Sequence, residues 1–204
     1  MVLTADRSRA TVRDLVAGIS PHDEREAADQ ARTLDWIDSG APLFRTAKPA
    51  TPPQHLVMYA ALVDETHRRI LLVDHINAGL FLLPGGHADP DEDPRDGIIR
   101  EVTEELGIMP PFHPAFGDAP LFLTVTWTRP PGTHQDVTLW FCFSANRFAP
   151  LTPDTREFRS MEWLPIDNPA VWAEDGFDPE MARFIGKLTA RSHQSALFPN
   201  PRHR

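Results

Sequence analysis

Acidic side chains are concentrated in a short stretch that follows two consecutive glycines. Glu101, Glu104 and Glu105 stand at positions i, i+3 and i+4, so a helix would place all three on one stripe. Like charges at this spacing repel by roughly 0.2–0.5 kcal/mol per pair, and Arg100, four residues before Glu104, can relieve part of that repulsion. Convergent carboxylate oxygens are the ligands that Mg²⁺ or Mn²⁺ prefers. The spacing therefore favours a metal site over an ordinary solvated helix face.

The helix that carries these carboxylates has well-marked ends in the sequence. Asp93 followed by Pro94 is typical of an N-cap and first helical residue, and Gly107 stands where a left-handed C-cap belongs. Pro110 and Pro111 prevent any continuation. A second stripe of the helix is apolar and should pack on the core, through Ile98, Ile99, Val102 and Leu106. The sequence thus predicts an amphipathic helix with one buried face and one acidic face.

Gly85 and Gly86 follow an apolar run and precede the acidic helix. Glycine lets the backbone approach a ligand closely, so this pair is suited to offer backbone groups to a metal-bound diphosphate. A Gly-Gly pair by itself is more simply read as a tight turn. Its value here comes from the helix that follows it.

Residues 86–108 carry a motif whose fixed positions are Gly86, Glu92, Arg100, Glu101, Glu104, Glu105 and Gly107, with aliphatic Val102 and Ile108. This pattern resembles the Nudix box, G-x5-E-x7-R-E-U-x-E-E-x-G-U with U aliphatic, at every specified position, and the chain resembles MutT-like Nudix hydrolases. The resemblance covers roughly residues 54–190. It implies an α/β fold, a Nudix-type α/β/α sandwich with a mixed β-sheet, here with an N-terminal helical extension.

The resemblance also implies roles for individual residues of the box. Glu104 and Glu105 would be metal ligands together with the carbonyl of Gly85, and Glu101 would be either a further ligand or the general base. Arg100 would orient the glutamates. The expected catalytic residues are therefore Glu101, Arg100 and Glu104, and the expected ion is Mg²⁺ or Mn²⁺.

The roles expected for the other site residues depend on fewer observations. Glu92 is expected to be structural or outer-shell. Glu157 resembles a downstream loop carboxylate that joins the metal site, although a surface glutamate explains it equally well. Asp178 matches the general place where such enzymes read a base, and an N-cap aspartate is the alternative. Gly86 and His87 complete the expected substrate-binding residues.

Several other polar residues lie near the expected rim of the site: His75, Asn77, His134 and Asp136. Each alone is most simply a residue of a solvated loop. His134-x-Asp136 has the spacing of another metal pair, but alternate residues on a strand share a face for structural reasons too.

The chemistry implied is attack of water on a phosphorus of a nucleoside diphosphate linked to another group. Two alternatives stay open: a non-catalytic nucleotide sensor on the same scaffold, and an isomerase on a related fold. A sensor has little physical need for all the acidic ligands. The isomerase type requires a catalytic cysteine, and Cys142, the single cysteine, lies in an apolar run. These points favour a metal-dependent pyrophosphohydrolase.

Composition narrows the partners. The 204 residues carry a net charge of −9, which argues against a surface for a nucleic acid polymer. A single cysteine excludes an internal disulfide, and no stretch is apolar enough for a secretory signal or a membrane span. We expect a cytoplasmic protein that binds a small-molecule nucleotide and no membrane, with a homodimer left open.

The chain divides into three expected parts: an N-terminal helical extension (1–50), a Nudix hydrolase domain (51–192) and a flexible tail (193–204). Prolines 49, 52 and 53 mark the first boundary. Two helices are expected before about residue 40, and a late helix from about residue 178. The expected strands are residues 55–63, 69–73, 80–83, 121–128, 137–144 and 158–164.

Overall fold

Strand β1 (Gln54–Asp64) shows how the sheet acquires two apolar faces. Successive side chains of a strand point to opposite faces. Met58 and Leu62 accordingly belong to one buried cluster, and Ala61 and Val63 belong to another on the opposite side. Both faces are covered, as expected for the central strand of a layered α/β fold.

The computed structural model describes residues 4–197 apart from 49, 131–132, 169–170 and 174. Its other strands are β2 (Arg69–His75), β3 (Leu80–Leu82), β4 (Gly85–His87), β5 (Phe122–Trp127), β6 (Gln135–Ser144) and β7 (Phe158–Pro165). They form a sheet of order β3-β2-β1-β6-β5, with β4 paired to β1 and β7 paired to β2. Strands β1 and β6 are parallel and the other pairs are antiparallel, so the predicted mixed sheet is confirmed.

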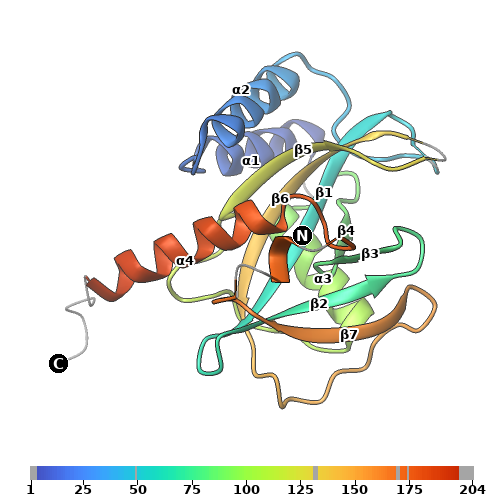
Figure 1. Cartoon of the computed structure of the whole chain (residues 1–204). Helices are drawn as coiled ribbons and strands as arrows, with labels where there is room; N and C mark the ends of the chain where they lie inside the picture. Colours follow the sequence, from blue (N-terminus) through green and yellow to red (C-terminus); the bar gives the residue numbers. More distant parts are fainter. Residues whose placement is uncertain (1–3, 49, 131–132, 169–170, 174, 198–204) are drawn as a thin grey trace.

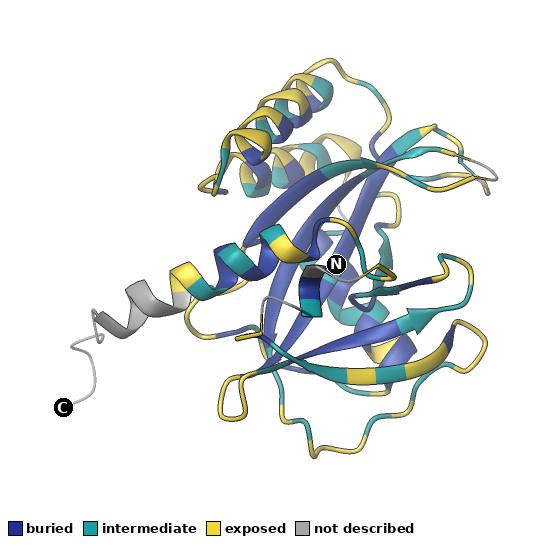
Figure 2. Cartoon of the chain, viewed as in Figure 1, coloured by how far each residue is buried: buried dark blue, intermediate teal, exposed yellow. Residues whose placement is uncertain are grey.

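Helices cover both faces of this sheet (Figure 1). The helices of the described residues are α1 (Ala5–Ala17), α2 (Glu24–Asp38), α3 (Pro94–Leu106) and α4 (Met181–Leu197), with a short 3-10 turn η1 (Val171–Ala173). Val16 of α1, Ile37 of α2 and Val102 of α3 share one buried cluster, whereas Phe184 of α4 packs in the other. The predicted α/β/α sandwich is confirmed, and Figure 2 shows the buried strands between the half-exposed helices.

Helix α3 has the ends that the sequence predicts. The Asp93 side chain accepts a hydrogen bond from the Arg95 amide at 3.0 Å, and Gly107 adopts a left-handed conformation with φ of 69°. Ile98, Val102 and Leu106 are fully buried against the sheet. Their burial leaves the acidic stripe on another side of the helix.

Helix α2 protects the edge strand β5. Glu26 accepts a hydrogen bond from the Leu123 amide at 3.2 Å, and Asp29 accepts one from the Val125 amide at 3.4 Å. Glu26 also pairs with Lys187 of α4 at 2.6 Å. Two amides at this edge of the sheet are thus satisfied by buried carboxylates, which leaves the covered part of β5 unsuited to pairing with another chain.

Two elements differ from the sequence prediction. Residues 85–87 were expected in a loop, yet they form β4, antiparallel to β1 with Met58 opposite Gly86. Pairing with a long central strand overrides the low strand propensity of two glycines. Helix α4 also runs on to Leu197, into the segment expected as a tail, while residues 198–204 lie outside the described part of the chain. None of the described helices is long and apolar enough to cross a lipid bilayer.

Candidate active site

The double glycine and the acidic helix are in direct contact. Gly85 donates its backbone N–H to Oε2 of Glu105 at 2.8 Å. A Cβ at Gly85 would lie 2.1 Å from the Met58 carbonyl oxygen, and a Cβ at Gly86 would lie 2.6 Å from Oε2 of Glu101. Both positions require glycine because a carboxylate or a neighbouring strand occupies the space of a side chain. The site therefore draws Glu101 and Glu105 against one short strand.

Arg100 connects the acidic residues of the helix. Its guanidinium donates to both carboxylate oxygens of Glu92 at 3.0 Å and to Glu101 at 2.8 Å. Its distance to Glu104 is 3.8 Å. The hydrogen bonds to Glu92, with the neighbouring charges, raise the pKa of Arg100 above its ordinary value. Arg100 is thus held by Glu92 in a position that fixes the carboxylate of Glu101.

Negative charge is concentrated beside Gly85 in excess of what Arg100 neutralises. The Glu105 side chain is buried, and this burial together with the charge of Glu101 raises the pKa of Glu105 to about 9, against the opposing effect of the Gly85 N–H. Burial likewise raises the pKa of Glu101, and Arg100 opposes the rise. A bound divalent cation would stabilise both ionised carboxylates, so the donor set fits such an ion.

Glu104 and Glu157 are the two other acidic residues that were predicted to bind metal. The Glu104 side chain is 64% exposed, and its Oε2 lies 3.8 Å from Nη1 of Arg100. Glu157 lies in the turn directly before β7, and its charge contributes to the raised pKa of both Glu101 and Glu105. The fold therefore brings Glu157 within electrostatic range of the box, although 52 residues separate it from Glu105 in the sequence.

Asp178 lies in the loop before α4, and His87 is the last residue of β4. The Asp178 side chain accepts a hydrogen bond from the Glu180 amide at 2.8 Å just before α4, as a helix-capping aspartate would. Burial raises the pKa of Asp178 to about 6. His87 ends β4, and its Nε2 lies 3.1 Å from Nε2 of His55 on β1.

One basic residue near the site was missed from the sequence. Arg45 belongs to the segment between α2 and β1, and it interacts electrostatically with Asp136, Glu101 and Asp89. It is half-buried, and desolvation lowers its pKa. No spacing rule connects Arg45 to the box, because 41 residues separate it from Gly86 and only the fold brings them together.

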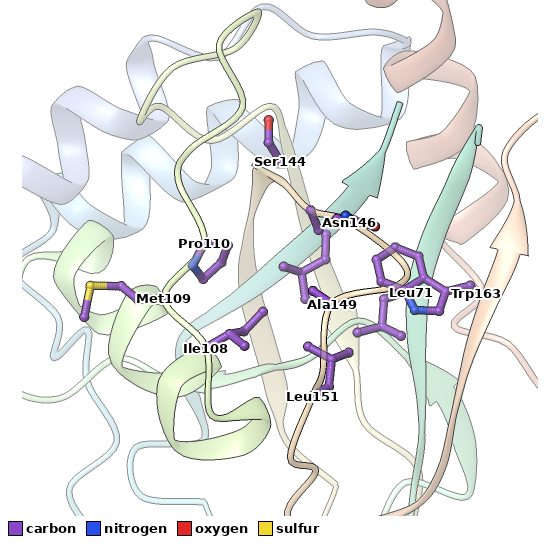
Figure 3. A pocket seen from close by; sticks show the side chains of 11 residues that line it. Leu71, Ile108, Met109, Pro110, Ser144, Asn146, Ala149, Leu151 and Trp163 are labelled. Carbon is purple, nitrogen blue, oxygen red and sulfur yellow. The ribbon is translucent and has the colours of Figure 1, made fainter. Parts of the chain in front are cut away.

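An apolar pocket of about 170 Å³ lies apart from the carboxylates, at the C-terminal end of α3 (Figure 3). Ile108, Leu151, Leu71 and Trp163 contribute to its wall. None of the predicted site residues lines it. This pocket is therefore separate from the predicted site residues.

The protein has a mixed sheet flanked by helices, and one of these helices carries carboxylates and follows a double glycine. These features together define a Nudix-type α/β/α sandwich. The family model of the NUDIX domain matches residues 53–189. The chain therefore belongs to the NUDIX (Nudix) family.

Curated relatives match parts of the chain. A MutT-like protein of Streptomyces ambofaciens is 41% identical over 58 residues, which is 28% of this chain and 38% of that protein. Nucleoside diphosphate-linked moiety X motif 6 of Homo sapiens is 31% identical over 88 residues, 42% of this chain and 27% of that protein. The m7GpppN-mRNA hydrolase NUDT17 of Bos taurus is 29% identical over 134 residues, 57% of this chain and 44% of that protein. The chain spans less than half the length of each of these relatives.

Solved structures share the fold. The MutT protein of Methanosarcina mazei Go1 superposes with a TM-score of 0.53 at 20% identity, over 69% of this chain and 96% of that one. The dihydroneopterin triphosphate pyrophosphohydrolase of E. coli gives a TM-score of 0.53 at 14% identity, over 74% of this chain and 99% of that one. The NUDIX domain of Shewanella oneidensis NrtR, solved with ADP ribose, gives 0.51 at 22% identity, over 68% of this chain and 88% of that one.

Proposed function

We propose that this chain is a divalent-metal-dependent hydrolase that cleaves the diphosphate linkage of a nucleoside diphosphate joined to another moiety. The observation that carries the proposal is the convergence of Glu101 and Glu105 on the backbone of Gly85 and Gly86. The matched proteins support it, since they include an m7GpppN-mRNA hydrolase and a dihydroneopterin triphosphate pyrophosphohydrolase.

The carboxylates of Glu104 and Glu105, the carbonyl of Gly85 and the carboxylate of Glu157 would hold Mg²⁺ or Mn²⁺. The ion would supply charge neutralisation and polarisation of the phosphoryl oxygens. Glu101 serves as a further ligand or as the general base. Its carboxylate is partly buried, and this burial raises its pKa, which suits a group that accepts a proton. Arg100 acts on Glu101 as a positioning residue through their 2.8 Å hydrogen bond.

Substrate phosphates need positive charge as well as metal, and Arg45 offers it beside Glu101. Gly86 would contact the diphosphate, and Asp178 would accept hydrogen bonds from the base. The substrate is a small nucleotide in this proposal. A cytoplasmic location, the absence of nucleic acid and membrane partners, and a homodimer stay predictions.

A release assay tests the function. Phosphate and pyrophosphate are measured with Mg²⁺ and after EDTA treatment, across nucleoside triphosphates, oxidised nucleotides, nucleotide sugars and dinucleotides. We expect turnover of at least one class that EDTA abolishes and Mg²⁺ restores. Glu104→Gln should lower kcat by on the order of 10²-fold with the fold intact by circular dichroism, because metal-assisted charge stabilisation is lost.

Glu162→Gln is the matched control, because Glu162 is an exposed glutamate of β7 away from the double glycine. Full activity of Glu104→Gln would remove Glu104 from the ligand set. Tight nucleotide binding without release from any substrate class would favour the sensor alternative and overturn the hydrolase.

A further inference from the structure

Three histidines and an aspartate meet at the N-terminal ends of β1 and β6. His55 lies on β1, His87 ends β4, and His134 and Asp136 flank the start of β6. One ligand atom from each lies within 4.8 Å of every other. These residues are separate from the box carboxylates, and only the pairing of three strands brings them together.

The spacing of these atoms suits a small cation. Nitrogen and oxygen ligands at 2.0–2.1 Å from a tetrahedral ion stand about 3.3 Å from one another. Here Nε2 of His55 lies 3.1 Å from Nε2 of His87 and 3.5 Å from Oδ1 of Asp136, and Nε2 of His134 lies 3.2 Å from the same oxygen. Three of the ligand pairs therefore already have the separation that one shared ion would impose.

The outer nitrogens of two histidines are held as they are in metal sites. Nδ1 of His55 donates a hydrogen bond to the carbonyl oxygen of Pro52 at 2.8 Å, so Nε2, which faces Nε2 of His87, carries the lone pair that a metal ion needs. Nδ1 of His134 is hydrogen-bonded to Thr128 Oγ1 at 3.1 Å. In both rings the partner of Nδ1 directs Nε2 toward the centre of the cluster.

Asp136 supplies an oxygen that the described residues leave unsatisfied. Its Oδ1 is buried and accepts no hydrogen bond from any described group, although two ring nitrogens lie within 3.5 Å. A buried, unpaired carboxylate oxygen is costly, and a cation would offset that cost.

We propose that His55, His87, His134 and Asp136 form a second metal site that binds one divalent transition metal of the Zn²⁺ type. Imidazole nitrogens select Zn²⁺, Co²⁺ or Ni²⁺ over Mg²⁺, whereas the oxygen-rich box selects Mg²⁺ or Mn²⁺. Four protein ligands close a tetrahedral shell, as in structural sites. The ion ties together β1, β4 and β6, and with them the strand that carries Gly85 and Gly86.

Two positively charged residues near the site should weaken its affinity for a cation. Arg45 interacts electrostatically with His55, His87 and Asp136, and Lys48 interacts in the same way with His87. These positive charges oppose a cation, so the neutralisation of Arg45 in Arg45→Gln should tighten metal binding. A site for an anion would show the opposite change.

Metal titration of the full-length, untagged protein after EDTA treatment and dialysis tests the proposal. Co²⁺ should give the visible absorption bands of a tetrahedral ion at one equivalent, and excess Mg²⁺ should leave them unchanged. Zn²⁺ should displace Co²⁺ and, at about 100 times its Kd, raise Tm by about 5–10 °C. These readouts do not depend on any hydrolase activity.

Substitutions of single residues identify the ligands of the ion. Asp136→Asn and His134→Gln should each weaken Co²⁺ binding by at least about 100-fold, the upper end of the loss seen when an outer partner alone is removed. Circular dichroism of the metal-free variants checks their fold. Glu105→Gln in the box and His67→Gln, a surface histidine paired with Asp64, should bind Co²⁺ as the wild type does.

The proposal is overturned if the wild-type protein shows no stoichiometric Co²⁺ binding. It is equally overturned if binding persists in both Asp136→Asn and His134→Gln, or if it disappears in Glu105→Gln, which would assign the ion to the box. Failure of the hydrolase assay would leave all of these outcomes readable.

Discussion

The amide of Gly85 and the carboxylate of Glu105 are joined by a 2.8 Å hydrogen bond between β4 and the last turn of α3. This contact buries an acidic side chain beside backbone that has no side chain of its own. It sets the distance between the helix and the strand, so a change at either end should disturb the carboxylates as a group.

Gly86→Ala should impair both catalysis and stability. The added Cβ would lie 2.6 Å from Oε2 of Glu101, so the carboxylate must move. We expect kcat to fall at least about 10-fold and the free energy of unfolding to fall by about 1–3 kcal/mol, the usual cost of overpacking. Steady-state kinetics and urea denaturation measure the two effects.

Gly79→Ala is the control for that substitution, because a Cβ at Gly79 meets no atom within 4 Å. Its φ of 62° makes it costly by about 1 kcal/mol for backbone reasons alone. An equal fall in kcat in both variants would mean that contact with Glu101 has no special role.

Arg45→Gln should raise KM by about 10-fold or more and change kcat by less than about 2-fold. The proposed role of Arg45 is contact with substrate phosphate, and loss of one charge-assisted hydrogen bond costs roughly 1.5–3 kcal/mol. Initial rates over a range of substrate concentration separate the two constants. An unchanged KM at low salt would exclude Arg45 from substrate binding.

Glu26→Ala should destabilise the protein by about 3–5 kcal/mol, the cost of leaving one member of a buried ion pair alone. Lys187, whose pKa burial already lowers, would lose its 2.6 Å partner, and the Leu123 amide would lose its acceptor. Denaturant unfolding followed by circular dichroism gives the change.

The double variant Glu26→Leu with Lys187→Met tests the reason for that loss. It removes both buried charges, so it should recover part of the stability while the Leu123 amide stays unsatisfied at a cost of about 1–3 kcal/mol. A double variant as unstable as the sum of both single changes would contradict the ion-pair explanation.

The Asp23–Arg183 pair should make stability depend on acid pH. The hydrogen bond from Arg183 lowers the pKa of Asp23 from 3.8 to about 2, so the stabilisation is complete above pH 3.8 and is lost as pH falls toward 2. Asp23→Asn keeps an N-cap for α2 but loses the pair. We expect a loss of about 1 kcal/mol in the free energy of unfolding at pH 7, because the Asp23 side chain is 34% exposed and solvent screens the pair.

Urea denaturation of both proteins at pH 7 and pH 3 checks this dependence. The gap between wild type and Asp23→Asn should narrow as the pH falls. A gap that stays constant or widens toward pH 3 would contradict the lowered pKa of Asp23.

Local signals in the sequence determined the acidic helix. The caps Asp93 and Gly107 and the apolar stripe through Val102 act over one or a few turns, so they predict the same helix that the fold contains. The same periodicity placed Glu101 and Glu105 on one side of it. The motif that these residues form was sufficient to indicate the family.

Only the tertiary structure decided which distant residues join that helix. Arg45 comes beside Glu101, and His55 comes beside His87 and Asp136, through strand pairing and through the path of the segment after α2. Such contacts depend on register between strands far apart in the chain, and no local propensity encodes them. The ends of helix α3 could thus be predicted from its own residues, whereas the residues that surround it were determined by the pairing of the strands.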